Sequence, residues 1–268
     1  MRIRPYLVLS LALTLTACGT KDDDGDSGFS DAGSIEGAGT NGGTSDGGSD
    51  GGGEEGGGDD SSDPMTAALY GSIIDESGNA IGEADIKLCT PLQCKTAVPN
   101  SEGSFEFVNI EGAYFALEIK GAAENSAVTL TFIDLAMEES RTIDTPIVIP
   151  TYKTSGDLGS TASIAVDGGL TISADANYTL PLGSGDKDYL SGVKMDPATA
   201  GLPIEGLGGE VVGMWYLGTY NTEVDPAWSF SIDTLEGVAA GDSLRVVTGD
   251  YLGNTWIEEG TATVDEGG

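Results

Sequence analysis

Histidine is absent from this chain of 268 residues, and basic residues are few. Without histidine, the chain lacks the usual general base, the usual zinc ligand and the central residue of a Ser-His-Asp triad. Eleven Lys and Arg residues stand against 44 Asp and Glu residues, and the formal net charge is −33. Because nucleic acids and anionic lipid headgroups are also negative, neither is expected as a partner. Cations remain open as ligands.

The apolar stretch at the N-terminus is too short to span a membrane. It runs over ten residues from Tyr6 to Leu15, whereas a membrane-spanning helix needs about 20. Arg2 and Arg4 precede it, and a short apolar run behind positive charges is typical of a secretory signal peptide. The stretch ends in Leu15-Thr16-Ala17-Cys18, which resembles the lipobox of bacterial lipoproteins. The alternative is an ordinary signal peptide followed by an accidental cysteine.

The lipobox resemblance covers the first 18 residues and implies a lipid anchor. Residues 1–17 would be removed as a lipoprotein signal peptide, and Cys18 would carry a diacylglyceryl thioether and an acylated amino group. Each buried methylene contributes about 0.8 kcal/mol, so two or three acyl chains make release negligible. Membrane lipid, held through Cys18, is therefore an expected partner. The residue after Cys18 is Gly19. Enterobacterial lipoproteins that are retained in the inner membrane often carry Asp at this position. The absence of Asp favours the outer membrane, on its periplasmic face or at the cell surface.

Large apolar residues are almost missing from residues 18–64. Residues 19–64 hold 16 Gly, 7 Ser and 13 acidic residues, and only Phe29 and Ile35 are large and apolar. Such a composition cannot bury enough surface to offset the entropy of ordering, so the segment is expected to be a disordered acidic Gly-rich tether. Its start, Lys21-Asp22-Asp23-Asp24, resembles the acidic export signal of some surface-exposed lipoproteins, although a plain solvated spacer explains it equally.

Cysteine is scarce, with three residues in the chain. A lipidated Cys18 leaves Cys89 and Cys94, which bracket Thr-Pro-Leu-Gln between two predicted strands. We expect them to form a disulfide, as suits an oxidising compartment. A metal site would need two further ligands that neither histidine nor another cysteine supplies, and a thioredoxin-like pair needs a two-residue spacing.

Residues 65–150 predict an antiparallel β-sandwich, because six or seven short runs alternate apolar and polar residues between turn residues. These runs resemble carboxypeptidase regulatory-like domains, which are transthyretin-like sandwiches. The resemblance covers about 80 residues and rests on Leu69 to Asp75 with Gly78 to Ile81, and on Asn100 to Phe107 with Ile110 to Tyr114. It implies a stalk, spacer, adhesive or recognition module without catalysis.

Three positions in residues 65–150 carry specific structural expectations. Gly71 lies in mid-strand, where a facing aromatic ring needs room, and Gly103 closes a hairpin turn where φ is expected to be positive. The family's tyrosine normally begins the inward-facing set, but here Phe115 is in register with Leu117. Either Tyr114 faces outward or a bulge intervenes.

Residues 151–268 predict a second β-sandwich-like domain, entered through a linker at Ser155-Gly156-Asp157. Together with residues 65–150 it makes an all-β chain with two sandwiches in tandem after the tether. Turns are expected at Asp225-Pro226 and at residues 238–242. The expected strands are residues 163–166, 170–173, 189–195, 210–220, 228–232, 244–248, 255–258 and 261–264.

All three tryptophans, Trp215, Trp228 and Trp256, lie in residues 151–268. Exposed aromatic rings could stack on sugar rings and bind carbohydrate, whereas a packed β core is the more common use of such residues. Trp215 and Tyr216 are adjacent in one predicted strand and face opposite ways, so only one of them can be core if one face is solvated.

No residue set points to catalysis, a cofactor or a metal. The acids lie mostly at exposed positions or in turns, and no Gly-x-Ser-x-Gly elbow or phosphate loop occurs. We therefore expect a non-catalytic lipoprotein with a structural or adhesive role at a surface. The alternative is a carbohydrate- or peptide-binding module that uses exposed aromatics, or that binds another surface protein. A calcium site at Asp75, Glu76, Asp186 and Asp188 is a lesser alternative, because no calcium-loop spacing is present.

Overall fold

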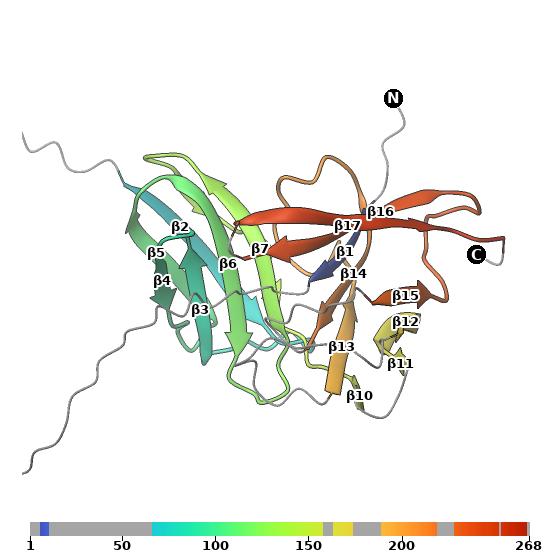
Figure 1. The fold of residues 1–268 in the computed structure, drawn as a ribbon. Helices are drawn as coiled ribbons and strands as arrows, with labels where there is room; N and C mark the ends of the chain where they lie inside the picture. Colours follow the sequence, from blue (N-terminus) through green and yellow to red (C-terminus); the bar gives the residue numbers. More distant parts are fainter. Residues whose placement is uncertain are drawn as a thin grey trace, which may run out of the picture. The chain divides into compact units, whose positions relative to one another are not determined.

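The computed structural model describes residues 6–10, 66–157, 163–173, 189–218, 228–251 and 253–266. Within these residues the elements are strands, apart from one short 3-10 helix, η1 (Asp167–Gly169), so the chain has the predicted all-β character (Figure 1). None of the described helical segments is long and apolar enough to cross a membrane. The described strands all belong to one compact unit.

Two sheets form the first half of this unit. One has the order β5-β2-β8, from β5 (Ser104–Ile110), β2 (Ala67–Ile74) and β8 (Ser140–Thr142), with β9 (Ile147–Val148) also pairing β2. The other has the order β4-β3-β6-β7, from β4 (Cys94–Ala97), β3 (Ala84–Cys89), β6 (Ala113–Gly121) and β7 (Val128–Leu135). Their alternating apolar residues are buried together, among them Leu69, Ile73, Ile86, Leu117 and Ile119.

Gly71 and Gly103 behave as the sequence predicts. Gly71 pairs with Phe105 across β2 and β5, and a Cβ atom at Gly71 would lie 2.5 Å from Cζ of the Phe105 ring. Gly103 has φ of +78° in the turn before β5, where its amide donates to the carbonyl of Asn100. Both glycines are therefore required by geometry, one for space and one for backbone conformation.

Tyr114 lies on the opposite face of β6 from Phe115, and the β6–β7 ladder runs without a register shift. Of the two alternatives left by the sequence, the structure has the outward orientation and no bulge. The outward face is nevertheless covered, because Tyr114 stacks on Phe132 and packs beside Tyr251 and Trp256 of the second half.

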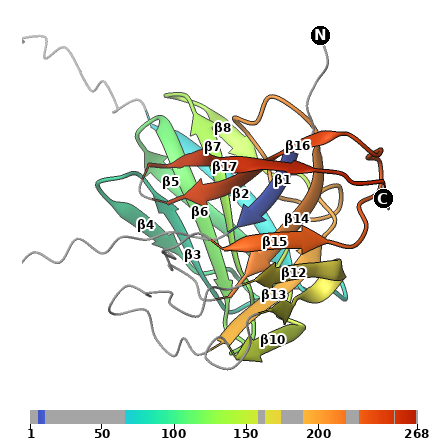
Figure 2. The same ribbon diagram turned by 45° about the vertical axis from the view of Figure 1, so that its right-hand side comes forward.

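The second half contains a six-stranded and a three-stranded sheet. The large sheet has the order β10-β13-β14-β1-β16-β17, and its strands are β10 (Thr154–Asp157), β13 (Tyr189–Met195), β14 (Val211–Leu217), β1 (Tyr6–Ser10), β16 (Ser243–Asp250) and β17 (Thr255–Thr263). The small sheet has the order β11-β12-β15, from β11 (Ile164–Ala165), β12 (Leu170–Ser173) and β15 (Ser229–Ile232). Figure 2 shows both sheets from a second direction.

The observed strands differ from the predicted ones at two places. Ser155-Gly156-Asp157 is not a linker but part of β10, which pairs with β13 in antiparallel register. Residues 255–258 and 261–264 are not separate strands. They belong to the single strand β17. The β16–β17 pairing shifts register between Val246 and Val247, which leaves Glu259 as an extra residue. This bulge interrupts the alternation of apolar and polar residues, so the sequence pattern shows two strands where there is one. The turn at residues 238–242 is present, whereas Asp225-Pro226 lies outside the described residues.

Strands β13, β14 and β16 of the six-stranded sheet carry buried residues on both faces, whereas the edge strand β17 has none. Met214, Tyr216 and Val247 join the hydrophobic cluster that contains the first-half core. Their neighbours Trp215, Leu217 and Val246 join a second cluster with the β11 and β12 residues. The sheet therefore separates two apolar layers, and the two halves of the unit share one of these layers.

Candidate functional site

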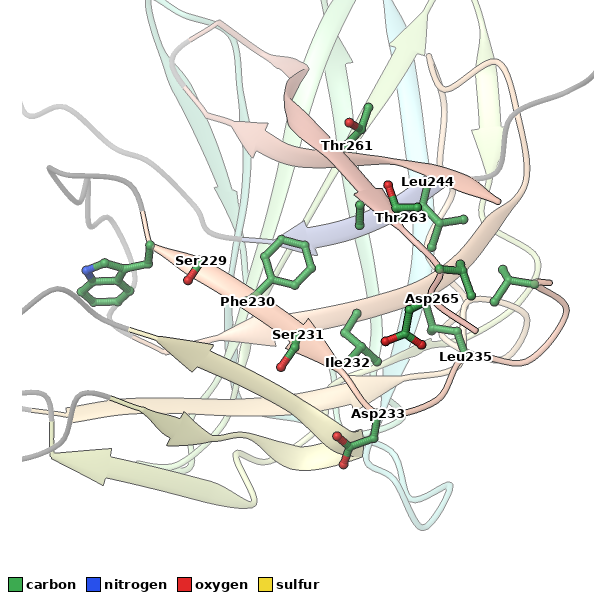
Figure 3. Close-up of a pocket in the computed structure, with 14 residues that line it drawn as sticks. Ser229, Phe230, Ser231, Ile232, Asp233, Leu235, Leu244, Thr261, Thr263 and Asp265 are labelled. Atoms are coloured by element: carbon green, nitrogen blue, oxygen red, sulfur yellow. The ribbon is translucent and has the colours of Figure 1, made fainter. Parts of the chain in front are cut away.

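A groove of about 690 Å³ lies between β15 of the small sheet and the last part of β17 (Figure 3). Both strands are at the ends of their sheets, so the sandwich is open along this side. The half-buried side chains of Phe230, Ile232 and Leu235 line the groove and also pack against the second cluster. The groove is thus an opening to the apolar layer between the two sheets.

Simple alternation positions the side chains of the groove. On β15, Phe230 and Ile232 are half-buried while Ser229 and Ser231 are exposed, because successive strand residues point to opposite faces. The end of β17 repeats the pattern, with Ala262 half-buried between exposed threonines.

The turn before β16 is fixed by the amide of Ala239, which donates to Oδ2 of Asp242 at 2.8 Å.

Apolar side chains line the groove, and exposed serine, threonine and aspartate residues border it. Two aspartates, Asp233 and Asp265, lie at one end of it (Figure 3). Among the described residues that line the groove, none is Lys or Arg. This composition suits a neutral or cationic ligand with apolar faces and hydroxyl groups, and it disfavours an anion.

The three tryptophans occupy different environments. Trp228 is half-buried and lines the groove together with Phe230. Trp215 is fully buried, its indole N–H donates to the carbonyl of Asp167 at 2.8 Å, and the ammonium of Lys194 lies 5.3 Å from its ring centre. Trp215 therefore offers no exposed face for a ligand, because β14, the strand that carries it, is covered on both sides.

Trp256 joins the two halves of the unit. Its ring meets Phe132 of β7 edge to face at a centroid distance of 5.0 Å, and its N–H donates to the carbonyl of Glu205 at 2.8 Å. Glu205 in turn pairs with Arg141. Trp256 is thus held by packing on both sides. Of the three tryptophans, Trp228 is the one that the structure places in a groove.

A second groove, of about 780 Å³, lies in the first half. Tyr70 and Phe105 line it beside Asn100, Glu106 and Asp144. Part of its lining falls in residues 69–75 and 100–107, which carry the family resemblance, but the sequence does not predict a groove there, because the residues come from four separate segments that only the folded structure brings together.

Cys89 and Cys94 are joined in a disulfide that closes the hairpin of β3 and β4. The phenolic oxygen of Tyr251 lies 2.6 Å from Sγ of Cys89 and 3.0 Å from Sγ of Cys94. Asn254 is buried beside it and donates to the carbonyl of Cys89 at 3.0 Å. The hairpin therefore touches the turn between β16 and β17. Cys18 lies outside the described residues.

One buried carboxylate lies near this contact. Glu118 of β6 is 4% exposed, and Oε1 accepts from Nζ of Lys87 at 3.1 Å. Burial raises the pKa of the Glu118 carboxyl, and the pairing with Lys87 opposes this only in part. Burial tends to lower the pKa of Lys87, but Glu118 and Asp85 more than offset it and raise that pKa.

The carboxylates considered for calcium are used inside the fold. Asp75 accepts from Asn79 and Ser77, and the hydrogen bonds from Asn79 chiefly lower the pKa of Asp75. Glu76 pairs with Lys153 at 2.8 Å. Burial tends to raise the pKa of Glu76, but the hydrogen bonds from Lys153 and Thr151 outweigh it and lower that pKa. Asp186 and Asp188 lie outside the described residues, and within those residues no group of three potential ligands is close enough to hold a metal.

Comparisons with known proteins show limited likeness. Neither a protein-family model nor a curated protein sequence matches the chain. Among solved structures, the Bacillus anthracis TIE protein matches 40% of this chain and 22% of its own, with 11% identity and a TM-score of 0.29. A Streptococcal ancillary pilin matches 57% of this chain and 63% of its own, with 13% identity and a TM-score of 0.28. A DUF3823 family protein from Bacteroides ovatus matches 63% of this chain and 97% of its own, with 15% identity and a TM-score of 0.25. Identities and scores this low assign neither a family nor a ligand.

Proposed function

We propose that this chain is a non-catalytic lipoprotein that displays its β unit from a membrane and serves a structural or adhesive role there. The observation that carries the proposal is Leu15-Thr16-Ala17-Cys18 at the end of a short apolar run behind two arginines. The 46 acidic and Gly-rich residues between Cys18 and Met65 support it, because they lengthen the distance between membrane and fold. A neutral Gly-rich coil of this length spans roughly 35–40 Å, and its negative charges extend it further.

Detergent partitioning tests the anchor. The native protein is expected in the detergent phase of a Triton X-114 separation, since its acyl chains enter micelles. Cys18→Ser is expected in the aqueous phase or as an uncleaved precursor. Cys89→Ser with Cys94→Ser is the matched control, because it removes the other two cysteines and leaves the anchor intact. Partitioning of Cys18→Ser and the native protein in the same way, with the same cleavage, would reject the anchor.

Binding of a neutral carbohydrate or an extended peptide at the groove between β15 and β17 is a second candidate function. The specific observation is that two aromatic residues, Trp228 and Phe230, line this groove, and that exposed serine, threonine and aspartate residues border it. Aromatic faces can stack on the apolar faces of a sugar ring while hydroxyls and carboxylates accept its hydrogen bonds. The proposal assigns no catalytic step to the groove.

Glycan and peptide arrays probed with the non-lipidated Cys18→Ser chain test this second function. For a ligand found on the array, Trp228→Ala is expected to weaken binding by about thirtyfold, as loss of roughly 2 kcal/mol from a central aromatic implies. Phe230→Ala should act in the same direction. Tyr70→Ala alters the other groove and is expected to leave binding unchanged. Equal loss in the Trp228 and Tyr70 variants would place the ligand elsewhere.

A further inference from the structure

Strand β1 is the part of the six-stranded sheet that comes from the proposed signal peptide. It pairs in parallel with β14 over five residue pairs, from Tyr6↔Val211 to Ser10↔Tyr216. It also pairs in parallel with β16 over three pairs, from Tyr6↔Arg245 to Val8↔Val247. β14 and β16 are therefore not neighbours, and β1 lies between them (Figures 1 and 2).

Removal of residues 1–17 takes β1 out of this sheet, so the inference rests on the cleavage in the proposed function. Adjacent strands lie about 4.8 Å apart, which leaves β14 and β16 roughly 9.6 Å apart, the width of one missing strand. The backbone groups of both strands that faced β1 then lose their partners inside the fold, which costs free energy until new partners are found. We call this gap between β14 and β16 the strand slot.

The walls of the strand slot require an apolar occupant. On one side lie Met214, Tyr216 and Val247 of the first cluster, and on the other lie Trp215, Leu217 and Val246 of the second. In the complete chain each of these six side chains is 6% exposed or less. A strand held between two such layers is buried on both faces, so its successive residues must be apolar rather than alternating.

The charges of the two strands beside the slot also favour an uncharged occupant. β14 has no charged residue, and on β16 Nε of Arg245 is held by Oε2 of Glu258 at 2.8 Å, while Asp250 lies at the end of β16 beyond the residues that pair with β1. A charged side chain on the incoming segment would find no partner among these residues. The mature tether does not meet the requirement, because residues 19–64 hold 13 acidic residues and two isolated large apolar ones.

We infer that in the mature protein the strand slot accepts an extended, uncharged apolar segment of another polypeptide, which runs parallel to β14 and β16. The segment adds a strand in the middle of a sheet, with main-chain hydrogen bonds on both of its edges. Such strand addition gives affinity through the backbone and selectivity through the side-chain pockets. Residues 6–10 show the length and direction that the slot accepts.

Peptide binding to the chain that starts at Gly19 tests the inference. The probe is a fluorescent peptide of residues 4–12 with a solubilising Lys tail. We expect saturable 1:1 binding by fluorescence anisotropy and, at hundredfold excess over the Kd, a rise in melting temperature of roughly 5–10 °C. The same peptide with Val8→Asp should bind at least a hundredfold more weakly. Full-length Cys18→Ala, which keeps residues 1–17 in place, should not bind the peptide.

A disulfide cross-link tests the register of the bound peptide. Leu7 pairs with Val246, so a Leu7→Cys peptide should cross-link to Val246→Cys protein and not to Thr248→Cys protein, which is two residues away. If the shortened chain does not fold alone, the peptide is expected to raise its refolding yield. An equal yield with and without peptide would then overturn the inference.

Other outcomes separate this inference from the proposed function. If the shortened chain has the same melting temperature as full-length Cys18→Ala and does not bind the peptide, then β14 and β16 pair directly. This outcome would reject the slot and leave the proposed anchor standing. A shortened chain that dimerises and protects the slot from peptide would also reject an occupant from another protein. Peptide binding to the shortened chain with no cleavage in cells would reject the anchor and also the inference, because β1 would then fill the slot in the mature protein.

Discussion

Single residues show where local pattern and tertiary setting agree. Gly71 is the clearest case, because the sequence marks it as a glycine inside a strand and the structure fills its missing side chain with the Phe105 ring. Trp215 and Tyr216 show where local pattern is insufficient. Their opposite orientations follow from strand geometry, but both are buried because sheets cover the strand on both sides. That coverage depends on distant segments and is not encoded near either residue.

Gly71→Ala should destabilise the protein by about 1–3 kcal/mol, since the new methyl group overpacks against Phe105. Urea denaturation measures the change in the free energy of unfolding. Phe105→Leu in the same chain shortens the ring that causes the clash, so the double variant should recover part of the loss. Costs that simply add in the double variant would show that the two residues do not compete for this space.

Glu118→Gln should change how stability depends on pH. Because burial raises the pKa of Glu118, the folded protein holds the proton more tightly than the unfolded chain. The wild type therefore loses stability as pH rises from the ordinary glutamate value of 4.5 to the raised value in the fold. The melting temperature of Glu118→Gln relative to wild type should increase across that window and then level off.

Glu106→Gln is the matched control for that titration, since Glu106 is an exposed residue of β5 and the change removes the same charge from a solvated position. A difference between Glu118→Gln and wild type that stays constant from pH 4 to 8 would show that Glu118 is not held in the way the structure indicates.

At the scale of elements, the sequence predicts strands well where alternation is uninterrupted. β12 and β13 coincide with the predicted residues 170–173 and 189–195. The failures have physical causes. β10 contains Gly156, which suggested a linker, but the Cβ that glycine lacks would meet Ile164, so the glycine permits close packing. β17 contains a bulge that breaks its period of two.

The disulfide hairpin of β3 and β4 is an element that links the two halves. Replacing Cys89 and Cys94 by serine should cost roughly 2 kcal/mol through the entropy of the small closed loop. The Tyr251 hydroxyl, which lies against both sulfur atoms, would also lose these two contacts. Differential scanning calorimetry of the double variant measures the loss, and a non-reduced digest should yield one linked peptide from the wild type. An unchanged melting temperature would show that the hairpin is held without the disulfide.

At the scale of the whole molecule, charge is the dominant feature. Residues 65–268 hold 31 acidic and 8 basic residues, and this excess destabilises the compact state by self-repulsion that salt relieves. We expect sodium chloride and calcium chloride at equal ionic strength to raise the melting temperature by about the same amount. Asp75 and Glu76 are engaged inside the fold, which favours this outcome. A much larger shift with millimolar calcium would reveal a specific site instead.

The proposed site could be predicted only in part from the sequence. Trp228 is one of three tryptophans that the sequence offers, but the groove that it shares with Phe230 depends on how β15 and β17 approach each other. In residues 228–232, serine alternates with large apolar residues. This pattern indicates a half-buried strand and does not by itself indicate a ligand-binding site.

The mass of the N-terminal peptide tests the membrane-anchored account most directly. The protein is purified from membranes with detergent and digested, and its first peptide is identified by mass spectrometry. The account predicts a peptide that begins at Cys18 and carries a diacylglyceryl group, with or without an acyl chain on the amino group. A membrane-extracted protein that retains residues 1–17, or that begins elsewhere with an unmodified Cys18 thiol, would contradict the account.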